Sequence, residues 1–309
     1  MFQMRELIIE LSNNCNLACK MCGFWQAGHD PKRFMGPELF KKVLGELGPF
    51  AKAIRLNGRG ESTIHPKFLQ MLEQTRHDFP RSDIILFTNA SFKSPKVLSG
   101  LVRNDVQLFL SIDSPVRFEL ENIRVGCDYD TVLSNIEGLS QMDRRPNIIF
   151  TMQEENLHRI LDIAKFALQH RSGIIYNTVR RDEGNEPFVD MVKDRLETVK
   201  NDFQEVRDLY KGTGLLCLIP DQISGIALGQ PGTVLTHGQR ATCPALSSEL
   251  CVLYNGDVTP CNMFNPYVFG NLVTDDIKTI LNGKERKVFL SGHKEHYYCR
   301  NCACMGGGT

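Results

Sequence analysis

Residues 5–22 read RELIIELSNNCNLACKMC, an apolar run followed by three cysteines. The first seven of these residues predict a strand with a core rich in leucine and isoleucine. The Ser-Asn-Asn that follows breaks the strand, so Cys15, Cys19 and Cys22 lie in the loop after it. A rigid strand that aims a flexible loop is the arrangement that lets three sulfurs gather at one site.

The spacing of these cysteines, C-x3-C-x2-C, supplies three thiolates rather than the four that close a structural zinc site. Thiolate ligands favour iron–sulfur clusters, zinc or Cu(I) over hard cations. On a four-iron cluster, three thiolates leave one iron without a protein ligand, and that iron can bind a substrate or a cofactor. The alternative interpretation is a group of thiols that serves as a redox site.

Composition and charge exclude several classes of protein. The chain has 309 residues, a hydrophobic content of 42%, and 36 basic and 36 acidic residues. Without a long basic run, nucleic acid is not an expected partner. No apolar stretch approaches the roughly 20 residues that span a bilayer, and the N-terminus lacks the pattern of a signal peptide. We therefore expect a cytoplasmic protein, in which the 11 cysteines serve metal sites rather than disulfides.

Predicted strands and helices alternate through about residue 180. The predicted strands cover residues 5–11, 53–56, 84–87, 106–112, 147–151 and 173–178. The predicted helices between them cover residues 37–47, 66–76, 95–102, 129–140 and 156–169. This alternation indicates an α/β fold with parallel strands and right-handed crossovers. Six such units form a partial (β/α)6 TIM barrel, with its active residues at the carboxyl ends of the strands.

The second half of the chain has a different organisation. Residues 184–211 carry apolar positions at three- and four-residue steps, which predict a long amphipathic helix. A short buried strand is expected at residues 215–219, and the chain becomes rich in cysteine and turns from about residue 232. We therefore divide the chain into a barrel (1–183), a helical linker (184–231) and a small C-terminal cysteine-rich module (232–309).

The triplet Cys15, Cys19 and Cys22, placed after the first strand, resembles the signature of the radical S-adenosylmethionine (radical SAM) enzymes. The resemblance implies the partial barrel and a [4Fe–4S] cluster on the three cysteines. It also implies that the open iron chelates the amino and carboxylate groups of SAM. An electron from the cluster then releases a 5′-deoxyadenosyl radical.

A second segment, NGRGESTIHP at residues 57–66, resembles the Gly-Gly-Glu-Pro motif of this family. The resemblance implies that Gly60 and Glu61 hold the amino group of SAM. Glycine permits close backbone approach, and a carboxylate can accept hydrogen bonds from an ammonium group. The segment departs from the motif at two positions, because Arg59 replaces the first glycine and Ser62 replaces the proline.

Residues at later strand ends extend the resemblance. Ser111, in a segment that continues to Asp113, resembles the serine that contacts the ribose or the carboxylate of SAM. Arg124 matches an arginine that pairs with the SAM carboxylate, a strong charge-assisted contact. The alternative for each is a capping or surface polar residue. Three further residues match family positions near the cofactor: Thr88, Asn89 and Thr151.

A second cysteine group lies in the C-terminal module. Cys243-x12-Gly256-x4-Cys261 precedes Cys299-x2-Cys302, and a hairpin that turns at residues 255–257 would bring the first two cysteines together. Four thiolates suit a closed [4Fe–4S] cluster or structural zinc. The spacing resembles the Twitch module, a shortened SPASM module, whose four cysteines hold an auxiliary cluster. Cys304 is an alternative ligand to its neighbours.

Cys251 lies in the predicted hairpin but is not one of the expected ligands. The resemblance implies that the module faces the mouth of the barrel. A thiol at this place can return a hydrogen atom to a substrate radical, as in some radical SAM epimerases of aminoglycosides and peptides. The alternative interpretation is a buried structural cysteine beside a cluster.

The resemblance implies an enzyme that uses SAM and two [4Fe–4S] clusters. Our first hypothesis is an epimerase (an isomerase) of a small polar substrate such as an aminoglycoside, of the kind found in antibiotic biosynthesis. Dehydrogenation of an aminocyclitol or sugar comes second, followed by modification of a ribosomal peptide, for which a separate leader-binding domain is expected but not seen. A zinc-binding or redox-sensing protein is the non-enzyme alternative. A flavodoxin- or ferredoxin-like reductase is the expected electron donor.

Overall fold

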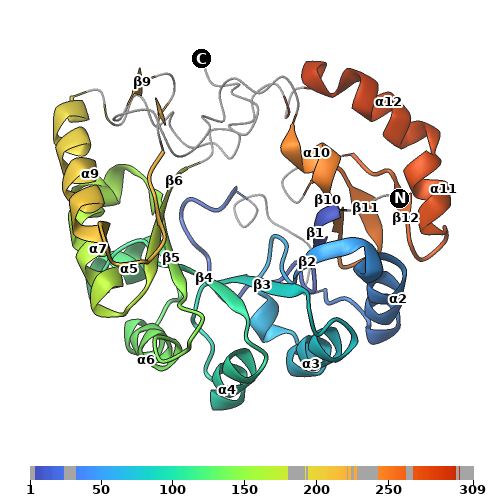
Figure 1. The fold of residues 1–309 in the computed structure, drawn as a ribbon, viewed down its shortest axis with the longest axis horizontal. Helices are drawn as coiled ribbons and strands as arrows, with labels where there is room; N and C mark the ends of the chain where they lie inside the picture. The colour runs from blue at the N-terminus through green and yellow to red at the C-terminus, as the bar shows by residue number, and fades with distance from the viewer. Residues whose placement is uncertain are drawn as a thin grey trace.

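The computed structural model describes residues 4–23, 33–179, 192, 194–220, 222–223, 226–227, 243–261, 267–296 and 299. It confirms the α/β fold, with strands that run around an arc and helices along its outer side (Figure 1). The strands of the arc are β1 (Met4–Ile9), β2 (Ala51–Arg55), β3 (Asp83–Thr88), β4 (Gln107–Ser111), β5 (Asn147–Met152) and β6 (Gly173–Thr178). The helices after them are α2 (Pro37–Leu47), α3 (Phe68–Asp78), α4 (Pro95–Arg103), α5 (Arg117–Ile123), α6 (Tyr129–Leu139), α7 (Ile160–Gln169) and α9 (Leu196–Tyr210).

Strands β1 to β6 are parallel neighbours in chain order, as successive βα units require. The sheet continues beyond them at both ends. Strand β7 (Cys217–Leu218) pairs in parallel with β6, and β10 (Glu249–Val252) pairs in parallel with β1. Within the described residues the result is a ten-stranded sheet in the order β12-β11-β10-β1-β2-β3-β4-β5-β6-β7. The C-terminal hairpin therefore belongs to the same sheet as the barrel.

Helix α2 illustrates why the outer layer forms. Proline at its first position begins the helix, because its fixed φ suits the first turn and its missing N–H is not needed there. The apolar residues at three- and four-residue steps are all buried against the sheet: Phe40, Val43, Leu44 and Leu47. Each buried side chain of this size contributes about 1.5–3 kcal/mol. The amphipathic pattern thus fixes which face of α2 meets the strands.

The two faces of β1 have different neighbours. Leu7 and Ile9 pack in the main core with helix side chains, whereas Ile8 packs with Cys251 and Leu253 in a separate cluster. Successive side chains of a strand point to opposite faces of the sheet. Because α2, α3, α4 and α6 lie outside the arc in Figure 1, the second cluster lies on its inner face. Cys251 therefore faces the inside of the arc.

The predicted C-terminal hairpin is confirmed. Strand β10 turns through Gly256, whose φ of +93° lies in the region that favours glycine, into β11 (Asp257–Thr259). The remaining elements of this part are α10 (Pro244–Ser248), β12 (Gly270–Asn271), α11 (Ile277–Asn282) and α12 (Lys284–Gly292). Both predicted domain boundaries, after residues 183 and 231, fall outside the described residues and stay predictions.

Some elements differ from the prediction. Helix α7 begins four residues later than expected, because Glu154–Arg159 form a 3₁₀ helix instead. Helix α9 confirms the C-terminal part of the helix predicted over 184–211, while residues 184–191 lie outside the described part of the chain. The strand expected at 215–219 shortens to β7, and the tiny hairpin of β8 (Gln222–Ile223) and β9 (Ile226–Ala227) was not predicted. In the described part of the chain, no helix combines the length and apolarity that a bilayer crossing needs.

Candidate active site

The loop that carries Cys15, Cys19 and Cys22 follows β1 directly, as the sequence predicts. Its backbone runs beside the chain that leaves α5. Ala18 N donates to the carbonyl of Val125 (2.8 Å), and Lys20 N donates to that of Ile123 (3.0 Å). The loop is thus held at both sides of Cys19, while all three cysteines remain half-buried.

The thiols lie among N–H donors. Leu17 N and Asn89 Nδ2 approach the Cys15 sulfur at 3.5 and 3.8 Å, and an Arg124 amino group approaches the Cys19 sulfur at 3.8 Å. Burial raises the pKa of Cys15 to about 12, and it also raises the pKa of Cys19 against the pull of Arg124. Such thiols lose their protons when a metal takes the thiolate. The N–H donors are then placed to stabilise the thiolate charge.

The donor set fits an iron–sulfur cluster. Among the residues that the structure describes, no three His, Cys, Asp or Glu side chains gather around a point where one metal ion would sit. A [4Fe–4S] cluster takes each thiolate on a different iron, so its cysteines need not converge on one point. The residues that would hold it are Cys15, Cys19 and Cys22, with the N–H donors around two of the sulfurs.

Gly60 lies where two backbone segments meet. A Cβ atom at this position would come within 2.4 Å of the Asn14 carbonyl oxygen and 2.6 Å of the Ser12 carbonyl oxygen. The next residue continues the contact, since Glu61 N donates to Asn14 O (2.8 Å). The segment after β2 therefore packs directly on the start of the cysteine loop, and only glycine fits there.

Glu61 is buried, and its carboxylate is bound by neighbours in the protein. Its Oε1 accepts from Thr63 N, Thr63 Oγ1 and Thr88 Oγ1 at 3.1, 2.7 and 2.9 Å, and its Oε2 accepts from Asn89 N at 2.8 Å. A carboxylate has about four lone-pair positions, two on each oxygen. Three of these four bonds share Oε1, so Oε2 retains one position for another donor. The hydroxyl of Thr88 thus helps to hold the Glu61 carboxylate in place.

Asn89 links two of the predicted elements. Its backbone N–H binds Glu61, and its side-chain amide donates to Asn16 Oδ1 (2.9 Å) and towards the Cys15 sulfur. Asn16 in turn donates to Ser91 O (3.1 Å). The end of β3 thus ties the glutamate to the cysteine loop.

Ser111 and Arg124 lie at the end of β4 and after α5. Ser111 is half-buried on the inner side of the sheet. Arg124 is buried and forms an ion pair with Asp113 (2.7 Å). Burial acts against the charge of Arg124, but the carboxylate of Asp113 raises its pKa. Burial also raises the pKa of Asp113, which Arg124 opposes.

Cys251 is completely buried on the inner face of β10. It is the register partner of Ile8 on β1 and of Thr259 on β11. Burial raises the pKa of its thiol to about 12, with a further contribution from the charge of Glu10. The side chain is therefore a protonated thiol at neutral pH. The structure places it inside the barrel sheet and not in a detached module.

The predicted auxiliary cysteines are partly described. Cys243 immediately precedes α10, which leads into β10, and Cys261 follows two residues after β11. Because β10 and β11 are antiparallel, the start of one lies beside the end of the other, so both cysteines lie at the same end of the hairpin. Cys299 is described and half-buried, whereas Cys302 and Cys304 lie outside the described residues.

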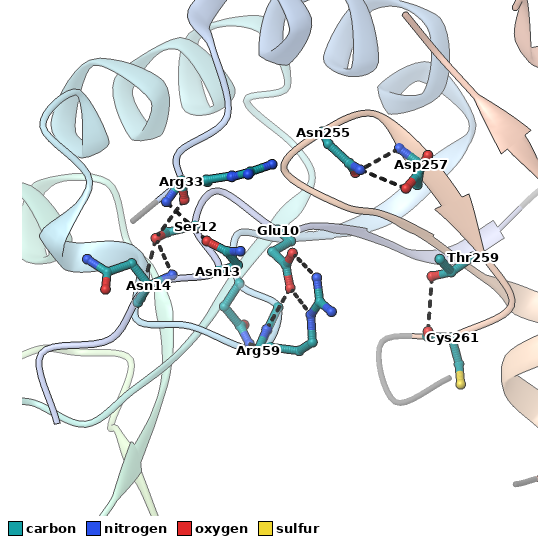
Figure 2. Close-up of polar contacts among 12 residues, drawn as sticks. Glu10, Ser12, Asn13, Asn14, Arg33, Arg59, Asn255, Asp257, Thr259 and Cys261 are labelled. Carbon is teal, nitrogen blue, oxygen red and sulfur yellow. Dashed lines mark hydrogen bonds and ion pairs between the residues drawn. The ribbon is translucent and has the colours of Figure 1, made fainter. Parts of the chain in front are cut away.

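A buried ion pair between Glu10 and Arg59 was not predicted from the sequence. Glu10 has no exposed surface, and its carboxylate accepts from Arg59 N, Nε and one amino group at 2.9, 2.8 and 2.7 Å (Figure 2). Burial lowers the pKa of Arg59, but the hydrogen bonds and the charge of Glu10 raise it. The pKa of Arg59 is therefore raised above its usual value. Arg59 is the residue that replaces the first glycine of the family motif, which explains how the barrel accommodates it.

Comparison with known families agrees with this geometry. The model of the radical SAM superfamily matches residues 9–167, just over half of the chain. The model of the SPASM iron–sulfur cluster-binding domain matches residues 243–303. The first match begins one residue before Glu10 and includes the whole cysteine loop. The second includes Cys243, Cys261, Cys299 and Cys302 and ends one residue before Cys304.

Individual proteins show similarity over different lengths. The chain is 39% identical over 114 residues to a tungsten-containing aldehyde ferredoxin oxidoreductase cofactor-modifying protein of Pyrococcus furiosus, which is 36% of this chain and 31% of that protein. The matched region thus spans about a third of this curated relative.

Two solved structures share the fold at a TM-score of 0.70. One is anSMEcpe with bound AdoMet, at 19% identity over 96% of this chain and 88% of that chain.

The other is SuiB of Streptococcus suis bound to S-adenosylmethionine, at 15% identity over 100% of this chain and 73% of that chain. Identities this low establish a common fold. The two domain matches carry more, because together they include the cysteine loop, the Glu61 segment and the C-terminal cysteines. The chain therefore belongs to the radical SAM superfamily and carries a SPASM domain, with SAM and two [4Fe–4S] clusters as its cofactors.

Proposed function

We propose that this radical SAM enzyme epimerises a small polar substrate, such as an aminoglycoside or another sugar, and that Cys251 returns the hydrogen atom. One observation carries the proposal. Cys251 is a protonated thiol on the inner face of the sheet, paired in register with Ile8 of the strand that leads into the cysteine loop. The proposed hydrogen donor thus lies on the strand next to the one that leads into the cysteine loop.

Cys15, Cys19 and Cys22 would hold the cluster, and bound SAM would supply the radical chemistry that removes a hydrogen atom from the substrate. The free position on Glu61 Oε2 suits the ammonium group of SAM. Arg124 Nε lacks a hydrogen-bond partner among the described residues and suits the SAM carboxylate, while Ser111 suits the ribose. Gly60 keeps the Glu61 segment against the cysteine loop.

The state of Cys251 suits hydrogen-atom transfer. Burial and the charge of Glu10 keep its proton in place, and a thiol rather than a thiolate is the form that can donate a hydrogen atom. Transfer forms a C–H bond on the substrate and breaks the S–H bond, which leaves a thiyl radical. One electron and one proton restore the thiol. We assign the electron to a flavodoxin- or ferredoxin-like reductase in the cytoplasm and the proton to solvent.

Deuterium incorporation tests the proposal. The anaerobic enzyme is incubated in heavy water with SAM, a reductant and a panel of aminoglycosides and aminocyclitols. We expect an epimer with one deuterium at the inverted carbon, because Cys251 exchanges its proton with solvent between turnovers. Cys251→Ala should keep both clusters and still form 5′-deoxyadenosine, yet give no inverted product. Cys127→Ala is the matched control, since Cys127 is half-buried and is not an expected ligand.

Other outcomes point to other reactions. Normal turnover by Cys251→Ala contradicts the donor role. A product two hydrogens lighter than its substrate favours dehydrogenation, and turnover of a precursor peptide favours peptide modification. The curated P. furiosus relative is named as a cofactor-modifying protein, which agrees with a small-molecule substrate in general terms. The family assignment removes the zinc-binding, non-enzyme alternative.

A further inference from the structure

We propose that Asp113 and Arg124 are a positioning pair that sets the charge beside Cys19, and through it the reduction potential of the N-terminal cluster. This inference depends on the family assignment and not on the proposed epimerase reaction. It adds a role to Arg124 that is separate from binding SAM. The pair acts on a cluster ligand, so its effect is measurable without SAM.

The backbone around Arg124 is what brings its side chain to the cluster loop. The carbonyls of Ile123 and Val125, on either side of it, accept from Lys20 N and Ala18 N. These two bonds flank Cys19 on the loop and Arg124 on the opposite segment. The two residues therefore face each other, and an Arg124 amino group lies 3.8 Å from the Cys19 sulfur.

Asp113 fixes the guanidinium in this position. Its carboxylate has no exposed surface and lies 2.7 Å from Arg124. Two further bonds hold Asp113 itself: Thr151 N donates to its Oδ1 (2.8 Å), and Asn156 Nδ2 donates to its carbonyl (3.0 Å). The ends of β4 and β5 thus hold the guanidinium of Arg124 beside the Cys19 sulfur.

The two charges act on the cluster with opposite signs. Reduction adds negative charge to the cluster, and a buried cation with an N–H directed at a ligand sulfur stabilises that charge. Hydrogen bonds to the sulfurs are one of the factors that set the potential of iron–sulfur clusters. Arg124 therefore raises the potential, whereas the carboxylate of Asp113 partly offsets it. A purely structural role would not predict that substitutions of Arg124 and Asp113 shift the reduction potential in opposite directions.

The test is a redox titration of the full-length, anaerobically reconstituted protein without SAM, followed by electron paramagnetic resonance. The N-terminal cluster is identified as the signal that is missing from a variant with Cys15, Cys19 and Cys22 replaced by alanine, and the auxiliary cluster serves as an internal reference. We expect Arg124→Gln to shift the N-terminal potential to a more negative value. Asp113→Asn, which keeps an acceptor for Thr151 N, should shift it to a more positive value.

Two variants complete the design. Arg124→Lys retains the charge and should keep the potential close to that of the parent. Comparing it with Arg124→Gln tests the proposal even if Asp113→Asn does not fold. Arg117→Gln removes an arginine from the same region whose side chain is 51% exposed and pairs with Asp130, and it should leave the potential unchanged. The proposal is overturned if Arg124→Gln leaves the potential unmoved, if Arg124→Lys and Arg124→Gln behave alike, or if Arg124→Gln and Asp113→Asn shift the potential in the same direction.

Discussion

At the scale of single residues, some site residues could be predicted from the sequence and the partners of others could not. The cysteines were predicted from their spacing along the chain, and Glu61 from the resemblance of its segment to a family motif. Glu10 and Asp113 were not assigned the partners they have, because Arg59 and Arg124 lie 49 and 11 positions away and nothing local marks the pairing. A charged residue that ends a buried strand was the one available signal for Glu10, since a carboxylate is buried only when it is paired.

Gly60 gives the sharpest prediction for a single residue. In Gly60→Ala the new Cβ would meet two backbone carbonyls of the cysteine loop at 2.4 and 2.6 Å, and backbone atoms cannot turn aside as a flexible side chain does. We expect the loop to shift and SAM cleavage to fall on the order of a hundredfold, as small misplacements of reacting groups do. Liquid chromatography of 5′-deoxyadenosine and analysis of iron measure the effect.

Gly36→Ala is the matched control, because nothing lies within 4 Å of a Cβ at that position. Its φ of −67° is open to any residue, so it should keep full activity. If Gly60→Ala retained its iron content and its SAM cleavage, the close approach between the two segments would not be needed for activity.

At the scale of elements, periodicity predicts the long regular pieces and fails for the short ones. Helix α2 and strand β6 match the predicted bounds, because their apolar spacing is unbroken. Helices α5 and α10 have seven and five residues, too few for a three- to four-residue period to repeat. The 3₁₀ helix before α7 has residues that suit either helix type, and the contacts of its asparagine Asn156 with Gln153 and Asp113 decide between them.

The Glu10–Arg59 pair joins the end of β1 to the segment after β2, and we expect it to stabilise that junction. Arg59→Ala would leave the carboxylate of Glu10 buried without its cation, a change that typically costs about 3–5 kcal/mol. Anaerobic chemical denaturation of the reconstituted protein measures the loss in free energy of unfolding. Arg103→Ala is the control, because its pair with Glu73 is exposed and worth less than about 1 kcal/mol. Equal losses in the two variants would show that the buried pair adds nothing special.

At the scale of the whole molecule, the parallel pairing of β10 with β1 could not be predicted. The turn through Gly256 gives a local signal for the β10–β11 hairpin, and the hairpin was predicted from it. The partner of β10 on its other side is a strand more than 200 residues away, and no local pattern reports such a pairing. The ion pair of Arg5 with Glu249 adds a side-chain contact to this junction.

The shared sheet predicts that the barrel and the C-terminal hairpin unfold together. Leu250→Ala removes a buried side chain of β10 and should cost about 2–5 kcal/mol. Hydrogen exchange followed by mass spectrometry should then show faster exchange in β1 and β2 as well as in the hairpin. Val288→Ala is the control, since Val288 is 54% exposed on α12. Faster exchange confined to β10, β11 and β12 would mean that the hairpin opens independently of the barrel.

The same pairing has a consequence for the protein while it is being made. Strand β1 leaves the ribosome well before the strand that covers one of its edges, because Glu249, the register partner of Glu6, follows 243 residues later. At ordinary rates of translation that interval is on the order of tens of seconds. Throughout it, the nascent chain presents an apolar parallel strand with one unpaired edge, the kind of edge that recruits other strands. The first strand of the barrel is thus among the last to be completed, and its edge stays open to other strands until the hairpin arrives.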